Sequence, residues 1–398
     1  MKTFHRRLAT GLALLASAFL IACATPQATT TAELPFDQAV SQVTDDLFKQ
    51  AQGGLLGQVE GKLLRRVLVV DPLLDGGSGQ QTAVTRSTEK RIVDKVRSTY
   101  TQFDVQPFQP GNLAKANLLL TGTLTRDSGP GSDPRRMRLA LAIVDLKTGK
   151  VAAQATARTR DDGLDTKPTP FYQDSPVLVR DPVVDGYIRT AETPPGQLAD
   201  KSYVEKVSTA ALIDEATTTY NNENYAEALK LYKAALAAPG GDQLRVHTGI
   251  YLSNLKLGKA ADAEQAFGRI VASGLSNNNL GVKFLFKPGS TDFWTDPKIS
   301  GPYVIWLRQI ARQSAAAKVC MNIVGHTSRT GSEQSNDRLS QQRAAIIKQR
   351  LETESSELSS RIKATGQGFR QTIVGTGSDD ARDALDRRVE FKIVNCPP

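Results

Sequence analysis

The chain has 398 residues, of which 23% are charged and 40% are apolar, and its formal net charge is +9. Since one hydrophobic core rarely extends far beyond about 150 residues, this length predicts several domains. No basic block is interleaved with aromatic residues, which argues against a nucleic-acid partner. The histidines, His5, His247 and His326, have no ligand spacing with the cysteines, and no Ser/His/Asp or Cys/His set is apparent. We therefore expect no metal site, no cofactor and no enzymatic activity.

Residues 1–22 have the features of a secretion signal. Three basic residues, Lys2, Arg6 and Arg7, precede the apolar run Leu8–Ile21, which is too short to span a bilayer as a helix. Loss of these three charges with the signal would lower the net charge from +9 to +6. The alternative is an uncleaved N-terminal anchor.

The residues that end this signal resemble the bacterial lipobox. Leu20-Ile21-Ala22 precede Cys23, and the cysteine of that motif is lipidated and becomes the mature N-terminus. Ala24 stands where an aspartate would be the usual inner-membrane retention signal. The resemblance therefore implies a lipid anchor in the outer membrane, facing the periplasm, with residues 23–35 as a tether.

Residues 36–160 are predicted to form a small α/β domain. Lys147-Thr148-Gly149-Lys150 indicates a hairpin between its last two strands. The order of elements faintly resembles the α/β domains of TolB, CsgG and penicillin-binding-protein activator lipoproteins. The expected helices are Phe36–Gln52 and Thr82–Tyr100, and the expected strands are Arg66–Leu73, Phe103–Phe108, Ala116–Thr125, Met137–Asp145 and Val151–Arg160.

A glycine-rich loop, Asp75–Gln80, lies between a predicted strand and a predicted helix, where a phosphate cradle would sit. It lacks the lysine and the spacing of a Walker motif. We interpret the loop as a flexible turn, with a small-molecule sensor as the alternative.

Residues 161–200 are rich in proline and have no clear periodicity. This composition predicts a linker or an ordered extended arm that would let the flanking domains reach apart. The prolines are Pro168, Pro170, Pro176, Pro182, Pro194 and Pro195.

Residues 201–278 have a helical pattern. Their aromatic and small residues resemble a tetratricopeptide repeat followed by a weaker second copy. Since fewer than three repeats rarely stand alone, we expect them to pack on a neighbouring domain, either as a scaffold or as a groove for an envelope protein partner. The residues that carry the pattern are Leu212, Ala216, Tyr220, Tyr225, Ala228, Tyr232, Ala235, Gly258, Ala263 and Phe267.

The most informative motif lies in residues 279–398. A β-type run, Val319–Val324, leads into the loop Gly325-His326-Thr327-Ser328-Arg329-Thr330-Gly331, and a helix is expected from about Asn336. Hydroxyls and backbone N–H groups at a helix N-terminus favour anions.

Arg343 is predicted to lie inside the apolar stripe of that helix. A partly buried guanidinium needs a carboxylate or a similar partner, and its planar fork suits bidentate carboxylate recognition. The alternative is an intradomain salt bridge or a snorkelling side chain, which is how we interpret Arg350. The stripe consists of Leu339, Ile346, Ile347 and Leu351.

Together with Leu339-Ser340, Arg343-Ala344 and Arg387-Arg388-Val389-Glu390-Phe391, these motifs resemble an OmpA-like C-terminal domain. The resemblance implies a βαβαββ fold that binds the peptide stem of peptidoglycan. In the family, an aspartate after Gly-His-Thr and the arginine hold the ammonium and carboxylate ends of diaminopimelate. The arginine corresponds to Arg343, but the aspartate position is Ser328. Thr327 and Asn336 match the pattern. A serine hydroxyl carries no charge, which implies weaker binding or a modified stem.

Cys320 and Cys396 remain once Cys23 is lipidated, and two cysteines in a secreted chain suggest one disulfide. Alternation places both on the same face of their strands. If these strands are antiparallel neighbours, the start of one meets the end of the other. Two free thiols are the alternative.

The sequence thus predicts a multidomain α/β plus all-α protein: an outer-membrane lipoprotein that binds peptidoglycan noncovalently and tethers the outer membrane to the cell wall. The alternative is an envelope assembly or regulatory factor, in which the upstream domains bind a protein machine and wall binding only positions them.

Overall fold

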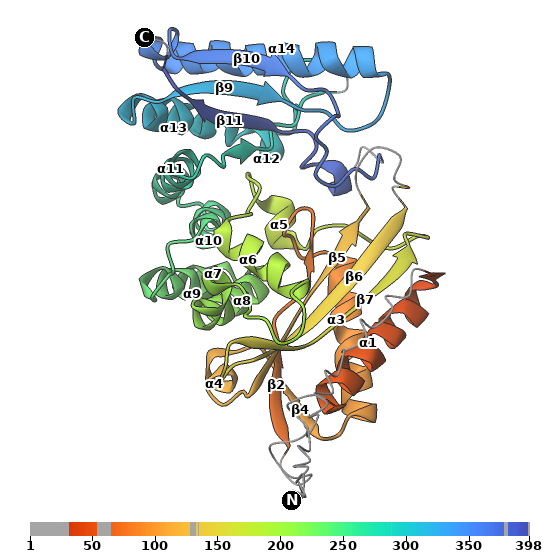
Figure 1. Cartoon of the computed structure of the whole chain (residues 1–398). Helices are drawn as coiled ribbons and strands as arrows, with labels where there is room; N and C mark the ends of the chain where they lie inside the picture. The colour runs from red at the N-terminus through yellow and green to blue at the C-terminus, as the bar shows by residue number, and fades with distance from the viewer. Residues whose placement is uncertain are drawn as a thin grey trace, which may run out of the picture.

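The computed structural model describes residues 32–53, 65–127, 133, 135–287, 289–377 and 381–396. The expected signal, Cys23 and nearly all of the tether lie outside these residues. Three blocks follow one another along the long axis of the molecule, with the α/β block and the C-terminal block at opposite ends (Figure 1). Of the helices in the described ranges, none is both long and apolar enough to cross a membrane.

The first block is a seven-stranded mixed sheet in the order β1-β7-β6-β5-β2-β4, with β3 paired to β5. The helices and strands expected in this region are present, with small shifts at their ends. The short elements β1, β3 and α4 were not predicted. The block consists of β1 (Glu33–Leu34), α1 (Phe36–Gly53), β2 (Arg66–Val70), β3 (Leu74–Asp75), α3 (Ala83–Thr99), β4 (Phe103–Gln106), α4 (Pro110–Leu113), β5 (Leu118–Arg126), β6 (Arg136–Asp145) and β7 (Lys150–Arg160).

Both faces of this sheet are covered, and alternation along each strand decides which face a side chain joins. Leu68 belongs to the core formed with α1 and α3. Its neighbour Val69 belongs to a second core on the other face, which contains Tyr187 and Tyr203. The central strands are therefore apolar on both sides.

The proline-rich residues 161–200 differ from the expected extended linker. They are ordered, and they contain α5 (Pro170–Asp174) and α6 (Pro182–Ala191). Each helix begins at a proline, because a residue in the first turn needs no backbone N–H partner. Phe171 and Val179 are buried in one core and Val184 in another, so the segment joins the blocks instead of separating them.

The Asp75–Gln80 loop is packed in place, and its interpretation as a flexible turn is wrong. Asp75 Oδ1 accepts hydrogen bonds of 2.6 Å from the backbone N–H and the hydroxyl of Ser78. Arg180 Nη1 donates to the carbonyl of Gly76 at 3.3 Å. A Cβ on Gly77 would lie 2.9 Å from the carbonyl oxygen of Ile373, so the loop touches the C-terminal block.

The middle block is helical, and each of its four long helices packs on the next. After the short α7 (Lys201–Val204), these are α8 (Val207–Asn221), α9 (Tyr225–Ala237), α10 (Leu244–Lys256) and α11 (Ala260–Ser276). A Cβ on Gly249 would lie 2.3 Å from the ring of Tyr232, so α10 lies directly against α9. α11 packs on α13 of the next block, so these helices do not stand alone.

The last block has the βαβαββ order and a sheet ordered β10-β9-β11-β8. Its buried residues form one cluster with those of the middle block: Phe267 from α11 and Ile323 from β9 belong to the same core. The elements are β8 (Gly281–Val282), α12 (Pro297–Ser300), α13 (Tyr303–Ala316), β9 (Cys320–Gly325), α14 (Glu333–Glu354), η1 (Ser356–Leu358), β10 (Ile362–Gly366), η2 (Ala381–Asp383) and β11 (Val389–Val394).

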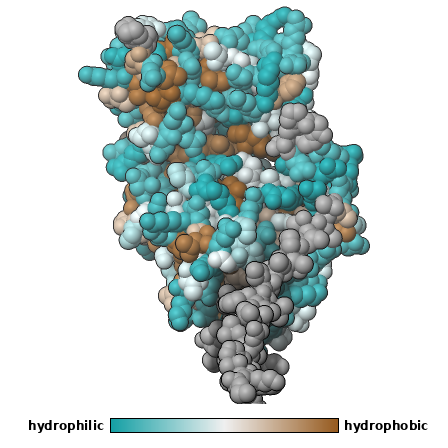
Figure 2. Space-filling view, in the orientation of Figure 1, coloured by the Kyte–Doolittle hydropathy of each residue, from teal (hydrophilic) through white to brown (hydrophobic). Residues whose placement is uncertain are grey.

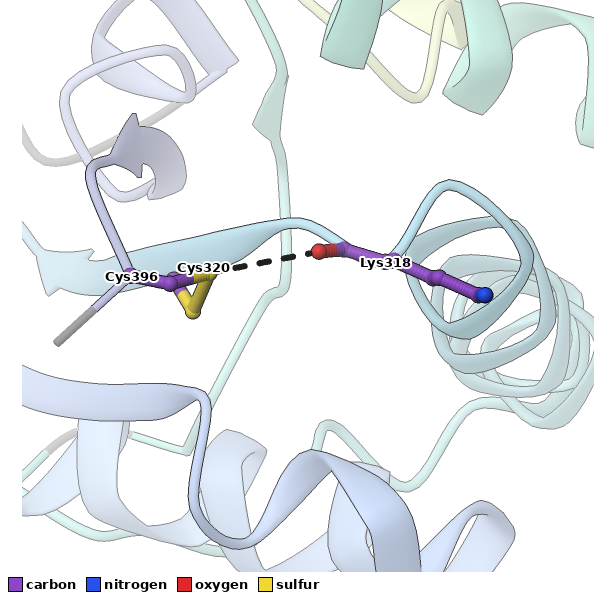
Figure 3. The surroundings of a disulfide bond; sticks show 3 residues. All are labelled: Lys318, Cys320 and Cys396. Carbon is purple, nitrogen blue, oxygen red and sulfur yellow. Dashed lines mark hydrogen bonds between the residues drawn. A yellow bond between two sulfur atoms is a disulfide. The ribbon is translucent and has the colours of Figure 1, made fainter. Parts of the chain in front are cut away.

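Cys320 and Cys396 form a disulfide with a Cα–Cα distance of 5.1 Å (Figure 3). β9 and β11 are antiparallel neighbours, and Val394 lies opposite Cys320. Cys396 follows two residues after Val394 and therefore lies near the start of β9. Both the pairing of the strands and the joining of the cysteines match the expectation from alternation.

Candidate functional site

All four predicted peptidoglycan-binding residues line one groove of about 740 Å³. Thr327, Ser328, Asn336 and Arg343 form part of one wall. The opposite wall comes from outside the C-terminal block, from residues 173–175 and from α10. Figure 2 shows apolar side chains gathered where the C-terminal block meets the helices below it.

The loop that carries Thr327 and Ser328 begins where β9 passes very close to α14. A Cβ on Gly325 would lie 2.2 Å from the carbonyl oxygen of Ser340, so only glycine fits there. The backbone N–H of Thr327 donates to the carbonyl of Gly368 at 2.9 Å. These two contacts hold the loop against α14 and against the residues that follow β10.

Thr327 is 3% exposed, and its hydroxyl has no hydrogen-bond partner among the described residues. A buried hydroxyl without a partner is unfavourable, since it has lost its water. Ser328 is also buried, and its Oγ lies 3.4 Å from Oγ1 of Thr330. Since Thr327 belongs to the groove lining, its unpaired hydroxyl is a candidate partner for a ligand there.

Asn336 fixes the junction between this loop and α14. Ser332 caps the helix by accepting a hydrogen bond from the backbone N–H of Ser335 at 3.2 Å. Asn336 Nδ2 donates to the carbonyls of Thr330 and Ser332 at 2.8 and 3.0 Å. Its role in this structure is to hold the loop in shape.

Arg343 lies inside the buried stripe of α14, as predicted, and is 6% exposed. Its Nε and Nη2 donate to the carbonyls of Ser290 and Lys287, each at 3.2 Å. Its guanidinium carbon lies 4.8 Å from the centre of the Phe286 ring. These contacts orient a cation along the edge of the groove.

Arg350, two turns further along α14, is exposed, and its guanidinium lies 4.8 Å from the centre of the Phe293 ring. Arg350 does not line the groove. This agrees with its interpretation as a side chain that covers apolar surface.

Glu390 is surrounded by two cations and by His326 of the loop. Glu390 Oε1 accepts a hydrogen bond from Arg388 Nε at 2.7 Å, and Oε2 lies 3.0 Å from Lys392 Nζ and 3.4 Å from His326 Nε2. Burial acts to raise the pKa of Glu390, but the cations and the imidazole around it hold the pKa well below its usual value. Burial also lowers the pKa of His326, so this histidine is neutral near pH 7.

A buried carboxylate fixes the loop after β10. Asp386 accepts hydrogen bonds from the backbone N–H groups of Ile373, Val374 and Gly375 at 2.6, 3.0 and 2.8 Å. Burial nevertheless raises its pKa. The next residue, Arg387, lines the groove.

The opposite wall was not predicted from the sequence. Lys283 of the C-terminal block lines the groove as well and is 8% exposed, and no sequence pattern identified it. Tyr251 and Lys256 reach the groove from α10, whose helical pattern carried no sign of a site. Tyr251 OH accepts a hydrogen bond of 2.7 Å from Trp306 Nε1, which joins the two blocks across this wall.

Comparison with known proteins identifies the family of one domain of the chain. The OmpA family matches residues 285–385, so the chain carries an OmpA-family domain there. No curated protein matches the chain at a significant level.

Several solved structures resemble part of the chain. The cell wall anchor of the T6SS from Pseudomonas aeruginosa is 22% identical over 29% of this chain and 78% of that chain, with a TM-score of 0.24. The peptidoglycan-associated lipoprotein from Burkholderia pseudomallei is 23% identical over 29% and 89%, with a TM-score of 0.24. An outer membrane protein from Borrelia burgdorferi B31 is 26% identical over 29% and 88%, with a TM-score of 0.22.

Proposed function

We propose that this chain binds peptidoglycan noncovalently in the groove of its C-terminal domain and, as a lipoprotein anchored through Cys23, tethers the outer membrane to the cell wall. The observation that carries the wall-binding part is that two suitable groups line the same groove. The guanidinium of Arg343 is positioned on its edge, and the buried hydroxyl of Thr327 has no partner among the described residues. Such a pair suits a ligand with a carboxylate and neighbouring polar atoms.

The lipid anchor is supported by the residues that end at Cys23 and by the OmpA-family domain at the other end of the chain. One lipid-bearing end and one wall-binding end make a tether.

The middle helices serve this function as a scaffold. α8 contributes Ala210 and Ala211 to the core beneath the sheet, and α11 packs on α13. Two of the four helices thus pack against neighbouring blocks, which favours a scaffold over a separate groove for a protein partner.

Arg343→Ala in the full chain tests the wall-binding function. Charge-assisted hydrogen bonds contribute about 1.5 to 3 kcal/mol each, so cosedimentation with isolated sacculi should weaken at least about tenfold. Arg350→Ala is the matched control, since it removes the same charge from the same helix outside the groove. Circular dichroism confirms that both variants fold. A folded Arg343→Ala protein that binds sacculi as tightly as wild type would rule out this site.

A further inference from the structure

The groove continues beyond the residues that the sequence motif identifies. Its far wall includes Asp174, Leu252, Leu255 and Lys256, none of which belongs to the OmpA-family match. A ligand bound at Arg343 therefore meets a second surface, supplied by the proline-rich segment and by α10.

This groove is strongly basic. Among the described residues that line it, Lys256, Lys283, Lys298, Arg343 and Arg387 are cationic. The one carboxylate in the same lining is that of Asp174. It is already engaged, because its Oδ2 lies 2.8 Å from Lys256 Nζ and 2.7 Å from the hydroxyl of Tyr220. The excess of positive charge attracts an anionic ligand.

Lys283 is the most unusual of these cations, since it is almost completely buried. Its Nζ donates to the carbonyls of Tyr172 and Gln173 at 3.2 and 3.0 Å, which uses two of its three N–H groups. Within the described residues, no carboxylate oxygen lies within 4.0 Å of this nitrogen. Burial lowers the pKa of Lys283 to about 8. The charge of Asp174 acts on Lys283 only from beyond 4.0 Å. A buried ammonium without a carboxylate in direct contact is unfavourable, so its third N–H suits a ligand carboxylate.

Lys283 lies close in the chain to the ring on which Arg343 stacks. Lys283 and Phe286, the residue on which Arg343 stacks, are three positions apart in the chain. Their Cα atoms are therefore at most about 10 Å apart, so one short segment supplies both Lys283 and the ring that holds Arg343. Apolar side chains such as Leu252 and Trp306 line the same groove and suit methyl groups between two carboxylates.

We propose that the groove is a two-carboxylate site for an acidic stem peptide, in which Arg343 receives one carboxylate and Lys283 receives a second. Residues 173–175 and α10 form the wall that encloses the second subsite. This assignment rests on the proposed function, because the peptide is the stem of peptidoglycan. It gives the upstream blocks a direct part in binding the wall.

The test uses the full chain and a diaminopimelate-containing muropeptide, prepared with all carboxylates free and with each one amidated in turn. Isothermal titration calorimetry measures binding to wild type, Lys283→Met, Arg343→Ala and the control Lys363→Met, which removes an exposed cation outside the groove. Two different amidations should each weaken binding to wild type by about tenfold. Lys283→Met should bind the peptide with free carboxylates about tenfold more weakly than wild type does. One of those two amidations should not weaken its binding further.

The outcomes separate the two proposals. If wild type does not bind the muropeptide, the proposed function fails, and the second subsite fails with it. A second outcome is that wild type binds and Arg343→Ala does not, while Lys283→Met either leaves binding unchanged or weakens binding of all peptides by the same factor. In that case the wall-binding function stands, and Lys283 only ties β8 to α5. If Lys283→Met does not fold, the affinities of wild type for the amidated peptides still test the proposal. The two-carboxylate site would be overturned if only one of the amidations weakened binding.

Discussion

Ser328 is an uncharged residue of the groove lining. It occupies the position at which the OmpA-like pattern has an aspartate, and its short hydroxyl lies beside that of Thr330. The neighbourhood is basic, with Arg343 and Arg387 lining the same groove. A ligand ammonium therefore finds a hydrogen-bond acceptor at Ser328 but no opposite charge.

Ser328→Asp should tighten binding to a muropeptide with a free ammonium group by about tenfold, because it adds a partly buried opposite charge. Ser328→Asn is the matched control, since it has the same shape without the charge. Fluorescence anisotropy with a labelled muropeptide measures both, with an N-acetylated ligand as the second arm. Weaker binding by Ser328→Asp would mean that the ligand of this groove lacks an ammonium group there.

At this scale the sequence identified residues of one wall of the groove and missed those of the other. Thr327, Ser328, Asn336 and Arg343 lie in one loop and one helix, so a local pattern could place them together. Lys283 and Lys256 reach the same groove from separate segments. Their approach depends on how the blocks pack, and neither position differs in composition from an ordinary surface lysine.

At the scale of elements, short-range patterns predicted most helices and strands but misjudged two segments. The prolines of residues 161–200 suggested an extended chain, yet Pro170 and Pro182 start α5 and α6. Phe171 and Val179 then bury the segment against other blocks. Burial of this kind comes from tertiary contacts, which composition does not reveal. The Asp75–Gln80 loop was misjudged for the same reason.

The disulfide is the covalent feature that stabilises the β9–β11 pair. It joins residues 76 positions apart, and closing a loop of this size in the unfolded chain contributes roughly 4 kcal/mol in the chain-entropy account. Reduction should therefore lower the urea midpoint followed by tryptophan fluorescence. A Cys320→Ala/Cys396→Ser double variant is the control, because its midpoint should not respond to reductant. Intact mass of the non-reduced protein checks the bond directly, and a mass matching two free thiols would contradict it.

At the scale of the whole molecule, the middle and C-terminal blocks share one hydrophobic core. Phe267 of α11 stacks on Trp306 of α13 with ring centres 5.6 Å apart. Tyr232, Phe267, Ile323 and Phe391 belong to the same buried cluster. The core around α1 and α3, which contains Phe48, is a separate cluster. Cooperative unfolding should follow these cores and not the boundaries that the sequence patterns suggest.

This arrangement can be tested because both tryptophans of the chain, Trp294 and Trp306, lie in the C-terminal block. Tyr232→Ala removes a fully buried ring from α9, which costs about 3 to 5 kcal/mol for an aromatic side chain. Since the core is shared, this change in the middle block should lower the urea midpoint that the tryptophans report. Phe48→Ala, an equally buried change in the other core, should move that midpoint much less while lowering the midpoint of the far-ultraviolet circular dichroism signal from the α/β block. If Tyr232→Ala left the tryptophan transition in place, the C-terminal domain would unfold on its own, and the helices would be an attached domain instead of one half of its core.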